Sequence, residues 1–370
     1  MFPGISKIIC ISALFFLLNL IPVKSQILQD TSTLNLVKED ISFIYNLNFT
    51  RSHELYRKIA ARYPDHPIVY LLKGLMTYWE NYPMLSNSDS RNSMEEDLRQ
   101  CMKISEKVVK PEYEAEYLLA NLCARGLLLL YYDDNGLVME VVPLTISTYK
   151  YLRHAFDLKT AAVDLNYFTG VYDYFREAYP KMYPVYKSLA FMFPHGDIEN
   201  GLAQLQTAAK NSVVMKAESS ILLIWIYLGY EDDPDESTMF ARFLLGKYPG
   251  NPYFHAYCIR NLLVLKEYDE AEKLMSAVKN GGSGYIESEL MILKGILQEK
   301  KYNNINLACQ LYRDGIRGLS AYGKYGDEFA AYGYFGLSRI SHENDLQNTR
   351  KTYRETAMKL ADIKKINFDK

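Results

Sequence analysis

The chain has 370 residues, of which 49% are hydrophobic and 23% are charged, and its formal net charge is −2. This length is sufficient for one large domain or two small ones, and no segment has the composition of a linker between two domains. Because the sequence contains no basic stripe and no block of Lys and Arg, it argues against a nucleic-acid partner.

The first 25 residues have the pattern of a secretory signal peptide. Lys7 precedes an apolar run of 16 residues from Ile8 to Val23, whereas a membrane span needs about 20. Small side chains stand at the −3 and −1 positions of a cleavage site after Ser25. We therefore expect a mature domain of residues 26–370 without a membrane span, located in the periplasm or outside the cell. A start at Gln26 also resembles exported proteins of Gram-negative Bacteroidota.

The remaining chain has the apolar period of amphipathic helices, and the alternation typical of strands is hard to find. In chain order, helical stripes are expected at 94–109, at 198–205 after the N-cap Asp197, and at 268–278 before a stop at 280–282. One aromatic stripe with helical spacing belongs either to the core or to a groove. It consists of Phe168, Tyr172, Phe175 and Tyr179. These patterns predict an all-α fold.

Six glycines interrupt segments that otherwise read as apolar helices, although such a glycine costs roughly 1 kcal/mol relative to alanine. The usual compensation is a neighbouring helix that packs where a side chain would otherwise stand. The six are Gly74, Gly126, Gly170, Gly229, Gly295 and Gly336. Their recurrence predicts an irregular array of antiparallel helical hairpins.

The segment around Gly229 resembles the tetratricopeptide repeat (TPR), a helix–turn–helix unit of about 34 residues. Trp225, Leu228 and Gly229 are followed by Ala241 in the W-x2-L-G…A spacing of that family, and Ala271 matches the small residue of the next unit. The resemblance implies a TPR-like α-solenoid over residues 26–370. Residues 170–202, with their glycines and prolines, also resemble the irregular middle of the fungal inclusion-body-clearance proteins and their animal relatives.

The sequence contains no pattern of a catalytic, metal or phosphate-binding centre. Its six histidines form no His-Glu-x-x-His pair, and residues 281–284 lack the spacing of a nucleophile elbow. The acidic run 232–236 is more typical of a helix start than of a calcium site. We therefore expect a protein that is not an enzyme and has no metal and no cofactor.

Four cysteines follow the expected cleavage site, and their spacing matches no zinc site. We expect them to be buried free thiols, because each lies on an apolar helix face. A bridge between Cys101 and Cys123 stays open, since both flank a turn near Pro111 on two expected antiparallel helices.

The TPR resemblance also implies a binding surface, because the first helix of each repeat lines the concave face in that family. Taking each glycine as the eighth repeat position predicts contacts at Tyr78, Tyr174, Tyr230, Arg260, Glu299 and Lys300. We expect an exported scaffold that binds a protein or peptide of the cell envelope there. Two alternatives stay open: a carbohydrate-binding helical protein of a glycan-uptake system, and an enzyme with carboxylates in a helical cavity.

Overall fold

A computed structural model describes residue 27 and residues 30–107, 110–187, 191, 193–278, 284–343, 347–361 and 368. Within these residues every regular element is a helix, so the predicted all-α fold is confirmed. The predicted signal peptide, residues 1–25, and the predicted helix stop at 280–282 lie outside the described residues.

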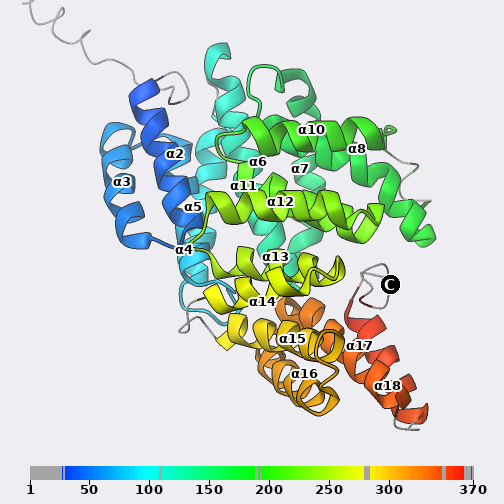
Figure 1. Ribbon diagram of the computed structural model, residues 1–370. Helices are drawn as coiled ribbons and strands as arrows, with labels where there is room; N and C mark the ends of the chain where they lie inside the picture. Colours follow the sequence, from blue (N-terminus) through cyan, green and yellow to red (C-terminus); the bar gives the residue numbers. More distant parts are fainter. Residues whose placement is uncertain are drawn as a thin grey trace, which may run out of the picture.

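Consecutive helices pack in pairs along the chain, as Figure 1 shows. The first four pairs are α2 (Thr31–Tyr45) with α3 (Phe49–Arg62), α4 (Pro67–Glu80) with α5 (Arg91–Ser105), α6 (Glu114–Asp134) with α7 (Val138–Leu158), and α8 (Leu165–Met182) with α10 (Ile198–Asn211). The next four are α11 (Lys216–Ile226) with α12 (Pro234–Lys247), α13 (Pro252–Val264) with α14 (Tyr268–Ala277), α15 (Gly284–Lys300) with α16 (Ile305–Leu319), and α17 (Asp327–Glu343) with α18 (Gln347–Leu360). Neighbouring pairs pack through their first helices at both ends of the array, as α4 with α6 and α13 with α15, and in the middle through the second helix of one pair and the first of the next, as α10 with α11. The fold is therefore an all-α array of hairpins, solenoid-like in its layering.

Two helix starts are capped by the aspartates that the sequence indicates. The Asp197 carboxylate accepts the backbone N–H of Asn200 at 3.0 Å before α10. Asp233 accepts the N–H of Glu236 at 3.0 Å, and Pro234 occupies the first turn of α12. The acidic run 232–236 therefore serves a helix start, where the helix dipole favours negative charge.

Close approach of helices explains four of the six interior glycines. A Cβ at Gly170 of α8 would lie 2.9 Å from the Gly201 carbonyl oxygen of α10, so the two backbones touch. Gly295 and Gly336 face the ring of Tyr312, and Gly74 faces a leucine on α5. Gly126 has ordinary contact distances around it, so the predicted close approach is wrong at that position.

The segment around Gly229 does not form a regular α-helical hairpin at its glycine. Gly229 lies in a π-helical turn, Tyr227–Glu231, which ends at Asp232 with φ of 56°. Leu228, Gly229, Ala241 and Ala271 are buried, and Trp225 is half-buried. A π turn inserts one residue into the helix and rotates the residues after it. These side chains are therefore buried, but the hairpin that they belong to differs in geometry from a regular repeat.

The array closes on itself, because early hairpins contact late ones. The side-chain amide of Asn251 donates to the Tyr45 carbonyl at 2.9 Å, and the Tyr253 hydroxyl donates to the Tyr82 carbonyl at 3.1 Å. The Tyr325 hydroxyl reaches the Met84 carbonyl at 3.2 Å. Helices from both halves of the chain therefore meet at the inner face.

The cysteines are free in the part of the chain that is described. The Cys101 thiol lies 3.4 Å from the Ala120 carbonyl, and the Cys123 sulfur lies 3.4 Å from the sulfur of Met215. No bridge joins Cys101 and Cys123, and both are buried thiols, as is Cys258. Cys309 is only half-buried, so the expected burial is wrong for that thiol. None of the described helices is apolar over a length that would cross a bilayer.

Candidate binding site

The predicted contact residues do not form an exposed surface. The exposed fractions are 3% for Tyr78, 0% for Tyr174, 9% for Tyr230 and 2% for Arg260. The prediction of a solvent-exposed concave face is therefore wrong for these four residues. Tyr174 and Tyr230 are buried because their rings pack against each other between neighbouring hairpins, whereas Tyr78 and Arg260 are buried in the wall of an inner cavity.

The side chains of the two remaining predicted contact residues, Glu299 and Lys300, already have partners within the C-terminal hairpins. The Glu299 carboxylate accepts hydrogen bonds from the Tyr312 hydroxyl at 2.6 Å and from Arg339 at 2.7 and 2.9 Å. Lys300 lies 3.4 Å from the same carboxylate. This cluster joins α15, α16 and α17, so its role in the structure is to hold these helices together.

The aromatic stripe on α8 is divided among several contacts. Tyr172 packs against Tyr149 and Phe156 of α7, whereas Phe175 packs toward α11. Phe168 is buried, and Tyr172, Phe175 and Tyr179 are half-buried. The Phe175 ring packs against Tyr230 at 5.5 Å and against Trp225 at 6.2 Å between centroids. Tyr174 donates its hydroxyl to Glu231. Tyr174 and Tyr230 therefore stabilise the hairpin contact.

Tyr78 and Arg260 line one cavity of about 470 Å³ on the inner side of the array. Its wall is mainly aromatic and comes from α4, α6, α8, α11, α13, α15 and α17 with their adjoining turns. The rings are Tyr78, Trp79, Tyr82, Tyr167, Trp225, Tyr257, Tyr285, Tyr325 and Phe329. The charged lining residues are Asp134, Glu218, Glu289, Glu328, Arg260 and Lys324. A volume of this size is typical of a ligand pocket.

Both basic residues of the wall already have partners. Arg260 donates to Glu328 at 2.5 Å, and its guanidinium lies 5.3 Å from the centroid of the Tyr257 ring. Lys324 donates to the Asp133 carbonyl at 3.0 Å and lies 3.1 Å from the Asp133 carboxylate. The carboxylates of Glu218 and Glu289 are therefore not neutralised by these two bases.

Glu218 and Glu289 each present a buried oxygen without a hydrogen-bond partner. Oε2 of Glu289 has none, and the residue is only 3% exposed. Oε2 of Glu218 also has none, although Tyr45 donates its hydroxyl to the other oxygen. Leaving a buried polar atom unpaired costs roughly 1–3 kcal/mol. The cavity therefore lacks hydrogen-bond donors at two defined atoms.

Burial raises the pKa of these acids. Desolvation raises the pKa of Glu218 to about 7 and that of Glu289 to about 8. It raises the pKa of Asp134, on the same wall, to about 7. At neutral pH the cavity therefore holds carboxyl groups that exchange between neutral and ionised forms, because the low-dielectric surroundings disfavour the charge.

The raised pKa of Glu289 predicts that the protein loses stability as the pH increases. The unfolded chain ionises this residue near its usual value of 4.5, whereas the folded protein retains the proton until about pH 8. Since the folded state binds more protons in this window, the free energy of unfolding falls as the pH rises. The melting temperature of Glu289→Gln, measured relative to that of wild type, should therefore rise as the pH increases from 5 to 9.

The matched control for this measurement is Glu287→Gln. Glu287 lies on the same helix but is exposed, so its replacement changes the net charge equally without affecting the cavity. Differential scanning fluorimetry across this pH range measures both variants. A difference between Glu289→Gln and wild type that does not vary with pH would contradict the buried-acid interpretation.

Sequence reasoning missed Glu218 and Glu289, although a signal for both exists. Glu289 lies four residues after Tyr285 and three before Ile292, on the buried stripe of α15. Glu218 precedes Leu222 and Trp225 by four and seven residues on α11, and both of these line the cavity. An acid on an apolar helix stripe is rare unless it is paired, so this pattern identifies such positions.

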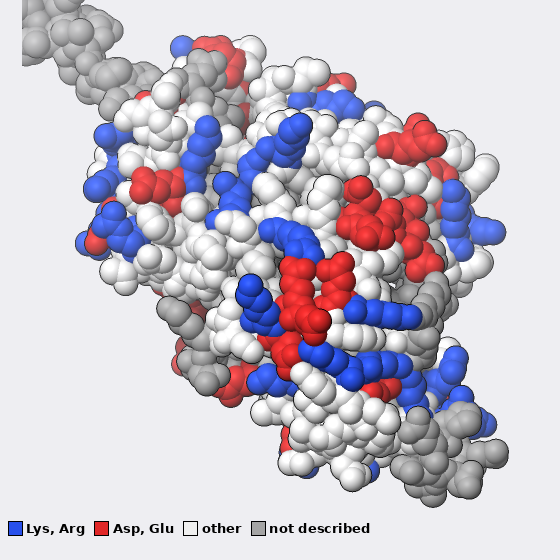
Figure 2. Space-filling view, in the orientation of Figure 1, with Lys and Arg blue, Asp and Glu red and all other residues white. Residues whose placement is uncertain are grey.

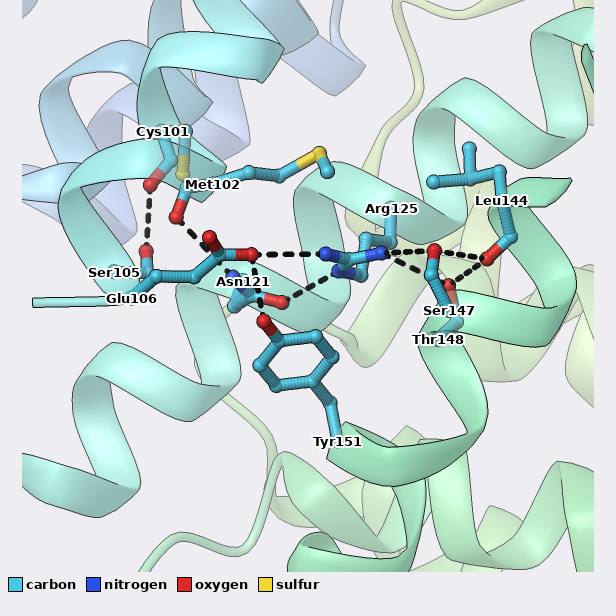
Figure 3. Close-up of polar contacts among 10 residues, drawn as sticks. All are labelled: Cys101, Met102, Ser105, Glu106, Asn121, Arg125, Leu144, Ser147, Thr148 and Tyr151. Carbon is cyan, nitrogen blue, oxygen red and sulfur yellow. Dashed lines mark hydrogen bonds and ion pairs between the residues drawn. The ribbon is translucent and has the colours of Figure 1, made fainter.

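A second polar cluster, drawn in Figure 3, anchors α6 and leaves no obvious place for a ligand. The Arg125 side chain is buried and lies 4.4 Å from the centroid of the Tyr151 ring. Its three nitrogens donate to Glu106 of the turn after α5, to Asn121, and to Ser147 of α7, at 2.7–3.0 Å. Because every nitrogen has a partner, this cluster fixes α6, which carries one wall of the cavity.

The outer face over α12, α14 and α15 carries charges of both signs side by side (Figure 2). Arg242 lies 2.8 Å from Glu270, and Lys301 lies 2.6 Å from Asp269 and 2.7 Å from Glu272. Such exposed pairs contribute little to stability. This face presents no continuous basic track to a polyanion.

The start of α7 exposes an apolar row. Val138, Met139, Val142 and Ile146 are each more than half exposed, and their spacing places them on one side of the helix. Contiguous apolar rows of this kind are more typical of protein contact surfaces than of free surface.

Comparison with known proteins identifies no family for this chain. No family model matches the sequence, and no curated protein is significantly similar to it. Its function must therefore be inferred from the cavity and the surfaces described above.

Proposed function

We propose that this chain is an exported, non-enzymatic binding protein of the TPR-like type, which takes part of a protein or peptide partner into the inner cavity. Export is proposed from the signal-peptide pattern of residues 1–25. The observation that carries the binding function is the aromatic cavity of about 470 Å³ with two buried, unpartnered carboxylate oxygens. A ligand that donates hydrogen bonds to Glu218 and Glu289 offsets the cost of burying them.

The exposed apolar row of α7 supports a macromolecular partner. A small molecule that fills the cavity makes no use of Val138, Met139, Val142 and Ile146, whereas a protein would bury such a row. We therefore propose that one side chain or chain end of the partner enters the cavity, while the rest of the partner contacts the outside of the array.

The test is a selection of peptides from a displayed random library on the purified protein. Leu130→Trp should prevent binding, because Leu130 lines the cavity and is 49% exposed, so that a larger side chain there narrows the opening. Leu307→Trp is the matched control, since Leu307 is a 37% exposed leucine of α16 that is not part of the cavity wall. We expect enriched peptides to bind wild type and Leu307→Trp alike, and Leu130→Trp at least about tenfold more weakly.

Two results would contradict this proposal. One is the absence of any enriched peptide, and the other is equal binding of the enriched peptides to Leu130→Trp. The same three proteins should be applied to a glycan array. Glycans that bind wild type and are lost in Leu130→Trp, without any enriched peptide, would favour the carbohydrate-binding alternative.

One observation favours a second candidate, an enzyme that uses acid–base chemistry. General acids work best when their pKa lies near the working pH, and burial brings Glu218 and Glu289, which share one cavity, to about 7 and about 8. A panel of 4-nitrophenyl glycosides tests this possibility. Turnover that Glu289→Gln abolishes and Glu287→Gln retains would replace the binding function by a catalytic one.

A further inference from the structure

We infer that the group which enters the cavity is a cation, either a protonated amine or a guanidinium, bound between the carboxylates of Glu289 and Glu218 and the surrounding aromatic rings. This inference rests on the proposed binding function and specifies the chemistry of its ligand.

The balance of charge in the wall is the first argument. Four carboxylates face the cavity with two basic residues, and both bases are already paired, Arg260 with Glu328 and Lys324 with Asp133. Where Glu218 and Glu289 are ionised, an anion entering this space would be strongly repelled, because the surroundings are poorly hydrated. A cation compensates the excess of negative charge.

The unpartnered oxygen of Glu289 is the second argument. The ionisable groups that act on this carboxyl are Tyr285 of its own helix, Tyr82 after α4, Tyr257 and Arg260 of α13, and Glu328 of α17. Arg260 is the only cation among them, and it is bound to Glu328. An ammonium or guanidinium N–H is therefore the complement that Oε2 lacks.

Glu218, which lines the same cavity from α11, has comparable surroundings. Its carboxyl interacts with Tyr45 of α2, Tyr167 of α8, Tyr248 after α12 and Cys123 of α6. None of these groups carries a positive charge. Glu218 and Glu289 therefore both face the cavity without a basic neighbour that is free to neutralise them.

The aromatic wall is the third argument. Within it, the Tyr82 ring packs edge-to-face against Tyr325 and Tyr285, with centroids 5.7 Å and 6.2 Å apart. The π face of an aromatic ring attracts a cation that lies above it. This attraction is strongest where water is excluded, whereas a neutral hydroxyl gains no comparable term.

Isothermal titration calorimetry with two probes of similar shape tests the charge requirement. Benzylamine is the cation and benzyl alcohol its neutral counterpart. We expect benzylamine to bind wild type at least about tenfold more tightly than benzyl alcohol, which corresponds to about 1.4 kcal/mol. Glu289→Gln should remove most of this preference with little effect on the alcohol, and Glu287→Gln should leave both affinities unchanged.

The pH dependence gives a readout that a merely structural effect would not produce. Burial raises the pKa of Glu289 to about 8 and that of Glu218 to about 7, so an entering cation must displace protons at neutral pH. The affinity for benzylamine should therefore rise from pH 6 to pH 8. Titrations at pH 7 in buffers of different ionisation enthalpy should show net release of protons.

A further probe pair identifies the source of the cation. Nα-acetyl-lysinamide and its norleucine analogue compare a charged with an uncharged peptide side chain. Tighter binding of the lysine compound than of benzylamine indicates a basic side chain of a partner, and the reverse indicates a small amine.

The failure of this inference is distinguishable from that of the proposed function. Equal affinities for the charged and neutral probes would overturn the cation requirement while the cavity stands as a binding site. Lack of binding of every probe at millimolar concentration would also overturn it, and the peptide selection would then test the binding function independently. Selected peptides without Lys, Arg or a free amino terminus would contradict the inference as well.

Discussion

Replacement of Gly336 by alanine should destabilise the protein by roughly 1–3 kcal/mol, although alanine is the better helix former by about 1 kcal/mol. A Cβ at this position would lie 2.3 Å from Cε2 and 2.4 Å from Cζ of Tyr312. The ring cannot move away, because a Cβ at Gly295 on α15 would lie only 2.7 Å from its Cε1 atom. Its hydroxyl is also held by Glu299 at 2.6 Å. The added methyl group must therefore displace α17.

Gly246→Ala is the matched control for this substitution. Gly246 is a helical glycine of α12, and a Cβ there would have no atom within 4 Å. Chemical denaturation should show this variant to be as stable as wild type or up to about 1 kcal/mol more stable. In a Tyr312→Ala background the cost of Gly336→Ala should largely disappear, because the clashing ring is absent. A Gly336→Ala variant of wild-type stability would refute the close contact.

Asp164→Ala should cause a loss of roughly 3 kcal/mol or more in the free energy of unfolding. The Asp164 carboxylate is 2% exposed and accepts three consecutive backbone N–H groups, from Val213 at 3.0 Å, Val214 at 2.6 Å and Met215 at 2.9 Å. Alanine leaves all three donors in a mostly buried loop without this acceptor. The loop leads directly into α11, so the variant should also disturb the position of Glu218.

Urea denaturation of Asp164→Ala and Asp164→Asn, with Asp157→Ala as the control, measures this effect. Asp157 is a 78% exposed aspartate of α7, and its loss should change stability by less than about 0.5 kcal/mol. The asparagine variant retains one acceptor oxygen and should fall between alanine and wild type. If Asp164→Ala costs no more than Asp157→Ala, the three hydrogen bonds contribute little to stability.

The fold was largely predictable from the sequence because its signals are local. The apolar period, the N-caps Asp197 and Asp233 and the interior glycines each reflect neighbours along one helix or one hairpin. Gly170 and Gly336 lie at close helix contacts for the predicted reason. The π turn at Gly229 was not predictable in this way, since the sequence pattern of a repeat does not reveal one inserted residue.

The site was not predictable from the repeat pattern, because it depends on contacts between distant segments. The repeat pattern assigned Tyr78 and Arg260 to an exposed concave face, whereas both are buried in a cavity wall. The hydrogen bond from Asn251 to Tyr45 joins residues 206 positions apart, and no motif indicates it. The only local sign of the cavity in the sequence is the presence of two acids, Glu218 and Glu289, on apolar helix stripes.

The closure of the array has a consequence for how the molecule unfolds. In an open solenoid each repeat contacts only its neighbours, so that unfolding proceeds repeat by repeat and a shorter array can still be folded. Here the hydrogen bonds from Tyr253 to Tyr82 and from Tyr325 to Met84 make early and late hairpins depend on each other. Loss of either end removes contacts from the other, so unfolding should be all-or-none. For the same reason the chain should not tolerate the addition or removal of single hairpins, which open repeat proteins tolerate.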